Sequence, residues 1–426
     1  MTCEPMVDEV LEKRPTIDWK KLCLRDVATF ASGTTPSRAR QSEYFDGGTF
    51  PWVKTMDLNN SKVFATDECV TELAFRETSL KLNPSGSVLV AMYGGFQQIG
   101  RTGILTMNAA VNQAISVINP DPKYLSPSFL LYVLNFRIDY WKTVASSSRK
   151  DPNITSQDVR NFVLLVPHIS EQKAIVEVLD DINAVISSLE ALLAKKQAIK
   201  KGMMQMLLTG QTRLPGFSGD WTSLHVASNS TLKARIGWQG LTTDEYRSDG
   251  ECRLVGGTEF SDGRVDWSRT PFVDRWRYDQ DSGIQLRQGD VLLTKDGTIG
   301  KTAFVDELPG PCTLNSGVFV IRPTRKAYNS HFLYYMLRSK RFDEFLSRLT
   351  AGSTISHLYQ RDLVGLLLDV PPTLEEQGAI AKTLYGADAE LRALRGRLSK
   401  AQSLKQGMMQ ELLTGRLRLQ SVEATS

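Results

Sequence analysis

Two long stretches of the chain carry apolar residues at alternating spacings of four and three. The first runs through Ile175, Leu179, Ile182, Ile186, Leu189, Leu193, Lys196, Lys200, Met203 and Leu207. The second repeats this pattern 205 positions later, from Ile380 to Leu412. A period of 3.5 residues sustained over about five heptads is typical of a coiled coil. The pattern therefore predicts two long helices, each with one apolar face.

Capping signals mark the ends of both helices. Thr373 and Glu376 form the Thr-x-x-Glu pattern of a capping box, and Ser170 is the residue expected to cap the first helix. Gly210 and Gly415 stand where a glycine commonly ends a helix, because glycine enters the left-handed conformation without strain. These signals predict where each helix begins and ends.

Each predicted helix follows roughly 155 residues of a different character. Short runs rich in Val, Ile, Phe, Tyr and Thr, such as 87–93 and 317–321, are broken by Gly, Pro, Asn and Asp, which is typical of strands joined by turns. The segments 127–144 and 329–349 carry apolar residues at helical spacing. Both parts are therefore predicted to be α+β domains.

The order of one domain followed by one long helix occurs twice in the sequence. Matching residues recur in the same order at a shift that drifts only from 200 to 205 positions. The shared motifs are Asp18-Trp19 with Asp220-Trp221, Ile99-Gly100-Arg101-Thr102 with Ile299-Gly300-Lys301-Thr302, Val166-Pro167 with Val370-Pro371, and Leu207-Leu208-Thr209-Gly210 with Leu412-Leu413-Thr414-Gly415. An internal duplication predicts two similar domains, each followed by a similar helix.

The duplication divides the chain into six predicted segments. They are an N-terminal tail (1–15), a first domain (16–168), a central helix (169–210), a second domain (211–372), a distal helix (373–416) and a C-terminal tail (417–426). The first helix ends where the second domain begins and the second helix starts where that domain ends, so helices that pair must be antiparallel. The alternative is that each helix packs only on its own domain. The predicted fold is α+β, with two similar domains joined by two long antiparallel helices in a pseudo-two-fold arrangement.

Composition narrows the class of protein. The 426 residues are 41% hydrophobic and 23% charged, as in ordinary globular proteins, and a net charge of +4 permits a nucleic-acid partner without requiring one. No apolar run approaches the ~18 residues of a membrane span, so no membrane partner is expected. The five cysteines are scattered without a Cys-x-x-Cys pair, which predicts reduced thiols in a cytoplasmic protein.

Motifs for catalysis are not found in the sequence. The segment 296–302 resembles the end of a phosphate-binding loop, but Lys295 stands where that loop needs glycine. The four histidines, His168, His225, His331 and His357, are not at metal-ligand spacing. We therefore predict a non-catalytic chain without a metal site, which binds and organises other molecules.

On these residues the chain resembles the specificity (S) subunit of type I restriction-modification enzymes, the HsdS family. The resemblance extends from about Trp19 to Gly415. Its local matches are 32–38 (SGTTPSR), 47–58 (GGTFPWVKTMDL), the Glu-Gln pairs that follow Val166-Pro167 and Pro371-Pro372, and the two Leu-Leu-Thr-Gly ends. The second copy departs from the first of these motifs, since 232–236 reads LKARI. The order domain, helix, domain, helix carries the resemblance more than any short motif.

The resemblance implies that the two domains are target recognition domains, each reading one half of a bipartite, asymmetric site in double-stranded DNA. The helices would set the half-site spacing and dock two modification (methyltransferase) subunits. S-adenosylmethionine would be bound by those partners and no cofactor by this chain, and restriction (motor-nuclease) subunits would join the full complex. Two alternatives stay open: a coiled-coil adaptor without DNA specificity, and a self-sufficient restriction-methylation enzyme.

Candidate DNA contacts are basic, amide and hydroxyl side chains near glycine-rich turns, because phosphates need cations and bases need hydrogen-bonding groups. In the first copy they are Arg38, Arg40, Lys54, Tyr93, Gln97, Gln98, Arg101, Arg149 and Lys150; in the second they are Arg235, Gln239, Lys295, Thr298, Lys301, Arg348, Ser353 and Thr354. Both copies keep a cation at Arg101 and Lys301, which favours a phosphate contact. The dissimilar loops 93–98 and 295–298 are the candidates for reading different bases. For any one of these residues, a solvated surface position is the alternative.

Candidate docking residues for the modification subunits cluster at the helix ends. They are Met203, Met204, Leu207, Met408, Met409 and Leu412. Methionine-rich surfaces adapt to partners, although methionines at helical spacing also fill cores. Lys196 and Lys200 interrupt the apolar pattern, and their side chains are expected either to extend into solvent or to contact an acidic surface or DNA phosphates.

Overall fold

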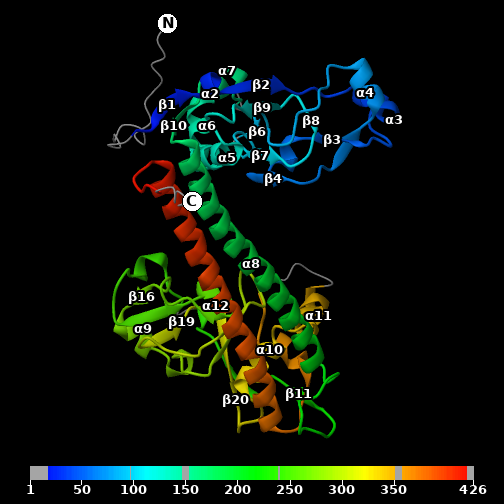
Figure 1. The fold of residues 1–426 in the computed structure, drawn as a ribbon. Helices are drawn as coiled ribbons and strands as arrows, with labels where there is room; N and C mark the ends of the chain where they lie inside the picture. The colour runs from blue at the N-terminus through cyan, green and yellow to red at the C-terminus, as the bar shows by residue number, and fades with distance from the viewer. Residues whose placement is uncertain (1–17, 96, 146–152, 238–239, 351–356, 420–426) are drawn as a thin grey trace. The chain divides into compact units, whose positions relative to one another are not determined.

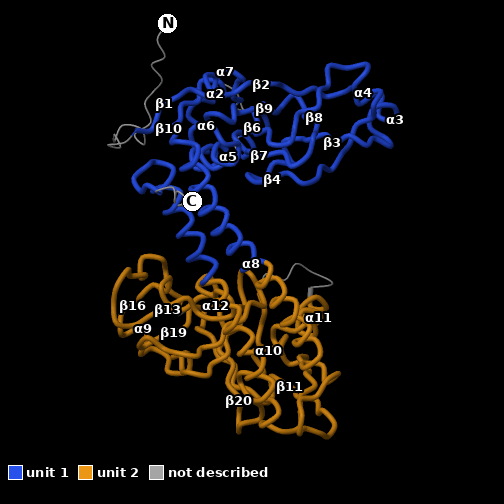
Figure 2. The backbone as a smooth tube through the Cα atoms, in the orientation of Figure 1, with its two compact units in different colours: residues 1–190, 397–426 blue, residues 191–396 orange. Residues whose placement is uncertain are grey.

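The computed structural model describes residues 18–95, 97–145, 153–237, 240–350 and 357–419. The chain forms two compact units: unit 1 comprises residues 1–190 and 397–426, and unit 2 comprises residues 191–396 (Figure 2). Two long helices, α8 (Ile169–Leu207) and α12 (Leu374–Leu413), each contribute to both units (Figure 1). Each unit therefore contains the start of one long helix and the end of the other.

Unit 1 contains three sheets. A five-stranded sheet has the order β2 (Ala28–Ser32), β9 (Ile115–Pro120), β6 (Val88–Ala91), β7 (Thr102–Leu105) and β4 (Ser61–Val63); a three-stranded sheet has the order β5 (Glu68–Val70), β3 (Phe50–Val53) and β8 (Ala110–Val111); and β1 (Lys20–Cys23) pairs with β10 (Val163–Val166). Its shorter helices are α2 (Leu24–Val27), α3 (Gln41–Tyr44), α4 (Glu72–Glu77), α5 (Pro127–Phe136), α6 (Ile138–Val144) and α7 (Ser156–Arg160).

Unit 2 repeats most of this plan. A four-stranded sheet has the order β12 (Ser230–Lys233), β20 (Val318–Pro323), β17 (Val291–Thr294) and β18 (Thr302–Phe304); a three-stranded sheet has the order β16 (Phe272–Val273), β13 (Cys252–Val255) and β19 (Cys312–Leu314); and β11 (Thr222–His225) pairs with β21 (Leu367–Val370). Unit 2 also contains the hairpin β14 (Phe260–Ser261) and β15 (Arg264–Val265), and the α-helices α9 (Arg275–Asp279), α10 (Ser330–Met336) and α11 (Lys340–Thr350).

The two units share their sheet topology strand by strand. The order β2-β9-β6-β7 matches β12-β20-β17-β18, and in both three-stranded sheets the central strand pairs with one antiparallel and one parallel neighbour. Unit 1 adds β4 parallel to β7, where unit 2 carries the hairpin β14–β15. The α+β class and the internal repeat predicted from the sequence are confirmed.

The segments predicted to be helical between the sheets and the long helices are each divided in two. In unit 1 the break falls at Arg137, between α5 and α6. The Arg137 guanidinium lies 4.7 Å from the centre of the Phe162 ring and donates to the carbonyl of Val163. In unit 2 the corresponding break separates α10 from α11. The apolar spacing runs through both breaks because both halves of each segment pack on the same core.

The two long helices pack against each other in opposite directions in each unit. In unit 1, Ile175 and Leu179 near the start of α8 share a core with Met409 and Leu412 near the end of α12. In unit 2, the core contains Leu207 and Leu208 together with Ile380, Ala381 and Leu384. The antiparallel pairing is therefore confirmed, and the alternative that each helix packs only on its own domain is wrong.

The predicted caps are formed in part. Thr373 accepts a hydrogen bond from the backbone N–H of Glu376, as the capping-box pattern predicts. The prediction for Ser170 is wrong, because α8 begins at Ile169 and the ring of His168 accepts the backbone N–H of Ser170 instead. Gly210 and Gly415 have φ of 72° and 73°, the left-handed conformation expected at the end of each helix.

The duplicated motifs meet where a domain joins the helices. A Cβ atom at Gly210 would lie 3.0 Å from the Trp221 ring, and one at Gly415 would lie 3.5 Å from the Trp19 ring. Each glycine therefore lets the tryptophan of an Asp-Trp motif pack closely against the end of a long helix. Buried Gln172 donates to the carbonyl of Pro167 at 3.0 Å, as its repeat partner does to that of Pro371. The motifs shared by the two copies therefore hold domain and helix together.

Candidate nucleic-acid interface

Three basic candidates of unit 1 are neutralised by carboxylates. Arg38 lies 2.7 Å from Glu68, and Lys54 lies 2.9 Å from the same side chain. The hydrogen bond from Lys54, and next that from Arg38, hold the pKa of Glu68 below its ordinary value. Arg40 pairs with Glu43 and with a second carboxylate, that of Glu77. These pairs fix the turn before α3 and leave little positive charge for an external phosphate.

The glycine-rich loop between β6 and β7 presents polar groups at the surface. Tyr93 is 40% exposed, Gln97 is exposed, and Gln98 is half-buried beside Thr55 and Met56. Its glycines are needed for their geometry: Gly100 has a φ of 77°, and a Cβ there would lie 2.2 Å from the ring of Trp141. The loop is therefore a backbone turn anchored against α6, with Tyr93 and Gln97 exposed at its surface.

Arg101 ends this turn with its cation available. Its Nε donates to the carbonyl of Gln97 at 3.1 Å, and no carboxylate pairs with it within the part of the chain that the structure describes. Arg101 is half-buried, and its hydrogen bond to the loop backbone positions the guanidinium. A cation held by the backbone rather than by an acid suits a phosphate contact.

Unit 2 contains the same turn between β17 and β18, with different side chains. Gly300 has a φ of 89°, and a Cβ there would lie 2.5 Å from Leu346 of α11. Lys301 is exposed and, among the described residues, has no acidic partner. The Thr294 hydroxyl donates a hydrogen bond to the backbone carbonyl of Thr298. The Thr298 side chain is exposed. The repeat therefore places Arg101 and Lys301 at the same point of the same turn.

Lys295 and its neighbours differ from the loop of unit 1. Lys295 lies 3.4 Å from Asp296, and the Asp296 carboxylate lies 2.6 Å from Nδ1 of His357. A backbone bridge also joins Asp296 to His357, so this loop is tied to the segment before β21. One copy thus presents tyrosine and glutamine at the turn, and the other presents a Lys-Asp-His cluster.

The remaining candidates lie in three kinds of place. Arg235 is only 2% exposed and donates to the carbonyl of Leu314 and to the hydroxyl of Thr313, so the structure corrects this candidate: its side chain supports β19 and does not reach the surface. Arg348 is exposed on α11. Arg149, Lys150, Gln239, Ser353 and Thr354 lie outside the described residues.

The docking candidates at the helix ends are core residues. Met203, Met204 and Leu207 pack in the core of unit 2, and Met408, Met409 and Leu412 pack in that of unit 1. The lysines that interrupt the apolar pattern form ion pairs within unit 2: Lys196 with Glu390 at 2.7 Å, and Lys200 with Asp388. Packing within the chain therefore accounts for all of these side chains.

An exposed apolar row on α8 was not among the residues predicted from the sequence. Leu192, Ile199 and Met206 are spaced by seven and are 38%, 45% and 46% exposed. Heptad spacing places them on one face of a helix. The signal was present in the sequence, one position before the pattern that forms the core.

The described residues contain neither a metal-ligand cluster nor a membrane-spanning helix. No group of three His, Cys, Asp or Glu side chains there could hold a metal ion. No helix in that part of the chain is both long and apolar enough to cross a membrane.

Comparisons with known proteins agree on one family. The family model described as "Type I restriction modification DNA specificity domain" matches residues 16–201 and 243–400. The type I restriction enzyme MjaVIII specificity subunit of Methanocaldococcus jannaschii is 22% identical over 423 residues, which cover 95% of this chain and 94% of the relative. The EcoR124I/EcoR124II specificity subunit of Escherichia coli is 24% identical over 185 residues, 43% of this chain and 45% of the relative.

Solved structures share the fold over nearly the whole chain. The S subunit of a type I restriction-modification system from M. genitalium superposes with a TM-score of 0.62 at 14% identity, covering 95% of this chain and 98% of that one. A chain from a study of complex assembly and conformational transition in a type I system has a TM-score of 0.53 at 18% identity, covering 94% and 98%. At these identities the likeness supports the fold alone.

Proposed function

Because the chain belongs to the type I restriction-modification DNA specificity family, we propose that it recognises a bipartite, asymmetric DNA target, with one half bound by each unit. The observation that carries this proposal is that the two units share one backbone turn but present different side chains on it. Both units build the same turn, at β6–β7 and at β17–β18, and hold it against a helix of the domain. The side chains that the two turns present are different. Such a pair of domains suits a site whose halves differ.

Within each turn, we assign two roles. Arg101 and Lys301 contact phosphates, because both copies keep a cation there without an acidic partner in the described residues. Tyr93, Gln97 and Gln98 in one unit, and Lys295 and Thr298 in the other, are the groups that read bases. Arg38, Arg40 and Lys54 support the fold of unit 1, because carboxylates neutralise them.

The long helices serve spacing and docking. Antiparallel pairing makes α8 and α12 a spacer, and its length fixes the distance between the half-sites. The exposed row Leu192, Ile199 and Met206 is the surface on which a modification subunit docks, since an apolar row on a helix surface suits a partner helix. S-adenosylmethionine and the methyl-transfer chemistry belong to two such subunits, and restriction subunits complete the assembly. The chain itself is non-catalytic and acts in the cytoplasm.

The experiment that tests this function is sequencing of modified bases in cells. The chain is co-expressed with its modification subunit, and methylated positions are mapped by long-read sequencing. The expected result is one motif with two different halves and a fixed gap. Replacing residues 218–370 with the domain of another family member changes one half only. A chain that supports no sequence-specific methylation favours the adaptor alternative, and methyl transfer by the purified chain alone favours the self-sufficient enzyme.

A further inference from the structure

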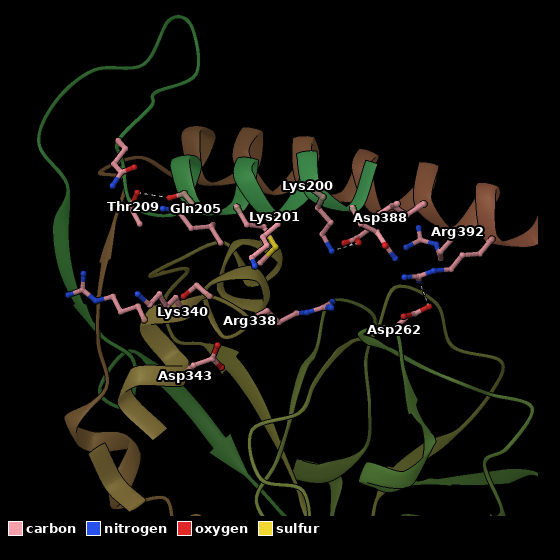
Figure 3. A pocket seen from close by; sticks show the side chains of 18 residues that line it. Lys200, Lys201, Gln205, Thr209, Asp262, Arg338, Lys340, Asp343, Asp388 and Arg392 are labelled. Carbon is pink, nitrogen blue, oxygen red and sulfur yellow. Dashed lines mark hydrogen bonds and ion pairs between the residues drawn. The ribbon is translucent and has the colours of Figure 1, made fainter. Parts of the chain in front are cut away.

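Unit 2 contains a pocket that the proposed DNA-binding function does not use. It lies between the second half of α8, the first half of α12 and the junction of α10 with α11, and its volume is about 760 Å³ (Figure 3). Met204, Leu208 and Leu391 form its apolar part, and charged and amide side chains surround them. Small-molecule sites typically have volumes of about 300–1,000 Å³ with this mixture of apolar wall and few polar groups.

The pocket is strongly basic. Seven of its lining residues are Lys or Arg, and three are Asp. Two ion pairs form inside it and two more join lining cations to carboxylates outside it: Lys200–Asp388, Arg395–Asp262, Lys340–Glu344 and Arg341–Asp369. Three of these pairs join separate segments of unit 2, and Lys340–Glu344 lies within α11.

Three cations are left over after this pairing. Lys201, Arg338 and Arg392 have no carboxylate partner in the part of the chain that the structure describes. Arg338 bonds the hydroxyl of Tyr334, and Arg392 lies 5.4 Å from the centre of the Tyr385 ring. Figure 3 shows Lys201 and Arg392 extending from the two long helices toward the side on which Arg338 lies. Asp343 is the one lining carboxylate without a cation partner among the described residues.

The first copy lacks these charges. The helix repeat, shifted by 205, places Gln406 at the position of Lys201 and Ser187 at that of Arg392. The repeat of α5 and α10, shifted by 203, places Asn135 at the position of Arg338. The same fold therefore forms without the three cations, so helix pairing and domain packing do not require them. Like charges brought together repel, and they suit an anionic ligand that neutralises them.

We propose that this pocket binds a phosphorylated small molecule of nucleotide size. The guanidinium groups of Arg338 and Arg392 match the geometry of phosphate oxygens, and Lys201 adds a point charge. The apolar side chains of Met204, Leu208 and Leu391 suit the uncharged part of such a ligand. A DNA duplex is too wide for a pocket of this volume. The equivalent described positions of unit 1 do not carry the three cations, so we expect one such ligand per chain.

The test uses the complete complex of the chain with its modification subunits, with ATP and inorganic pyrophosphate as separate probes in titration calorimetry. The triple variant Lys201→Gln, Arg338→Asn, Arg392→Ser copies the residues of the first copy, so it is compatible with the fold. The control variant Lys382→Gln, Arg397→Ser, Lys400→Gln removes three exposed cations from α12 outside the pocket. Any nucleotide binding by the partner subunits contributes equally to all three complexes.

The expected result is that the triple variant weakens the binding of at least one probe to the pocket by about tenfold or more. The control variant leaves this binding unchanged. Identical isotherms for the wild-type and triple-variant complexes overturn the proposal. It is also overturned if the triple variant lowers the salt dependence of DNA affinity, because the three cations then contact DNA phosphates. If the wild-type complex shows no specific DNA binding, the proposed function is refuted, while the result for the pocket still stands.

Discussion

Arg213 and Glu376 form a bidentate ion pair that joins the end of one long helix to the start of the other. The Arg213 Nη2 lies 2.6 Å from Oε2 of Glu376, and its Nε bonds Oε1. Arg418 holds Glu171 in the same way, at 2.6 and 2.8 Å. The two pairs are repeats of each other, because both the arginines and the glutamates are 205 positions apart. Because each arginine follows one helix and each glutamate opens the other, the pair can form only when the helices are antiparallel.

Removing Arg213 is expected to destabilise unit 2. Glu376 is 1% exposed, so Arg213→Met leaves a buried carboxylate unpaired and lowers the free energy of unfolding by about 3 kcal/mol. Arg418→Met is expected to cost less, since Arg418 is 42% exposed and Trp19 still donates to Glu171. Urea unfolding followed by hydrogen exchange in peptides of each unit measures both losses. Equal losses would show that neither the exposure of the arginine nor the hydrogen bond from Trp19 determines what each pair contributes.

The fold could be predicted because its signals are periodic or repeated. Heptad spacing from Ile175 to Leu207 identified α8, and its copy identified α12. Chain order then fixed their antiparallel direction, since a helix that enters a domain and a helix that leaves it must oppose each other. The duplication also predicted one topology for both units. None of these signals depends on which side chains meet in space.

The contacts of single basic residues could not be predicted in this way. Arg40 meets Glu77, 37 residues later, and Arg235 meets Leu314, 79 residues later. Charge in a sequence does not reveal whether a distant carboxylate or carbonyl already satisfies it. For the same reason the pocket of unit 2 could not be predicted, since Lys201, Arg338 and Arg392 come from α8, the α10–α11 junction and α12 and converge only in the fold.

Neutralising the turn cations is expected to weaken DNA binding without changing the target. Lys301→Gln and Arg101→Gln should each reduce the slope of log affinity against log salt by about 1, the effect of losing one phosphate contact. The control is Arg40→Gln, which removes a cation already paired with Glu43 and Glu77. Duplex binding by the full complex at several salt concentrations gives the slopes. Should the Arg40 variant lose as much slope as the Lys301 variant, the division between paired and free cations would be wrong.

Stability of unit 2 is expected to fall in mild acid through His331. Its ring stacks 4.2 Å from that of Phe304 and packs on Tyr335, and burial lowers the pKa of His331 despite the opposing charge of Asp306. The unfolded chain then binds the proton more readily than the folded chain. The stability contributed by the neutral ring is therefore complete above the unfolded value of about 6.5 and is lost as the pH falls toward the folded value.

A His331→Gln variant isolates this contribution. Its urea midpoint should change less between pH 7.5 and pH 5.5 than that of the unaltered protein, because glutamine does not titrate. Replacing the more exposed His357 in the same way provides the comparison, since that ring lies at the surface beside Asp296. A His331→Gln protein with an unaltered pH profile would remove His331 as the cause.

Lengthening the spacer is expected to widen the gap in the DNA target. Because α8 and α12 pair, four residues must be added to both, after Glu190 and before Arg397, where each helix passes between units. Four residues add about 6 Å and turn the following domain by only ~40°. DNA rises ~3.4 Å per base pair, so the gap should grow by one to two base pairs while both half-sites stay the same.

Adding two residues to each helix turns the domain by ~200° and should abolish methylation. Four residues in α8 alone would shift α8 against α12 in one of the two units and disrupt the pairing there. The methylated motif in cells carrying each variant is the measurement, and an unchanged gap after the paired insertion would show that the helices do not set the distance.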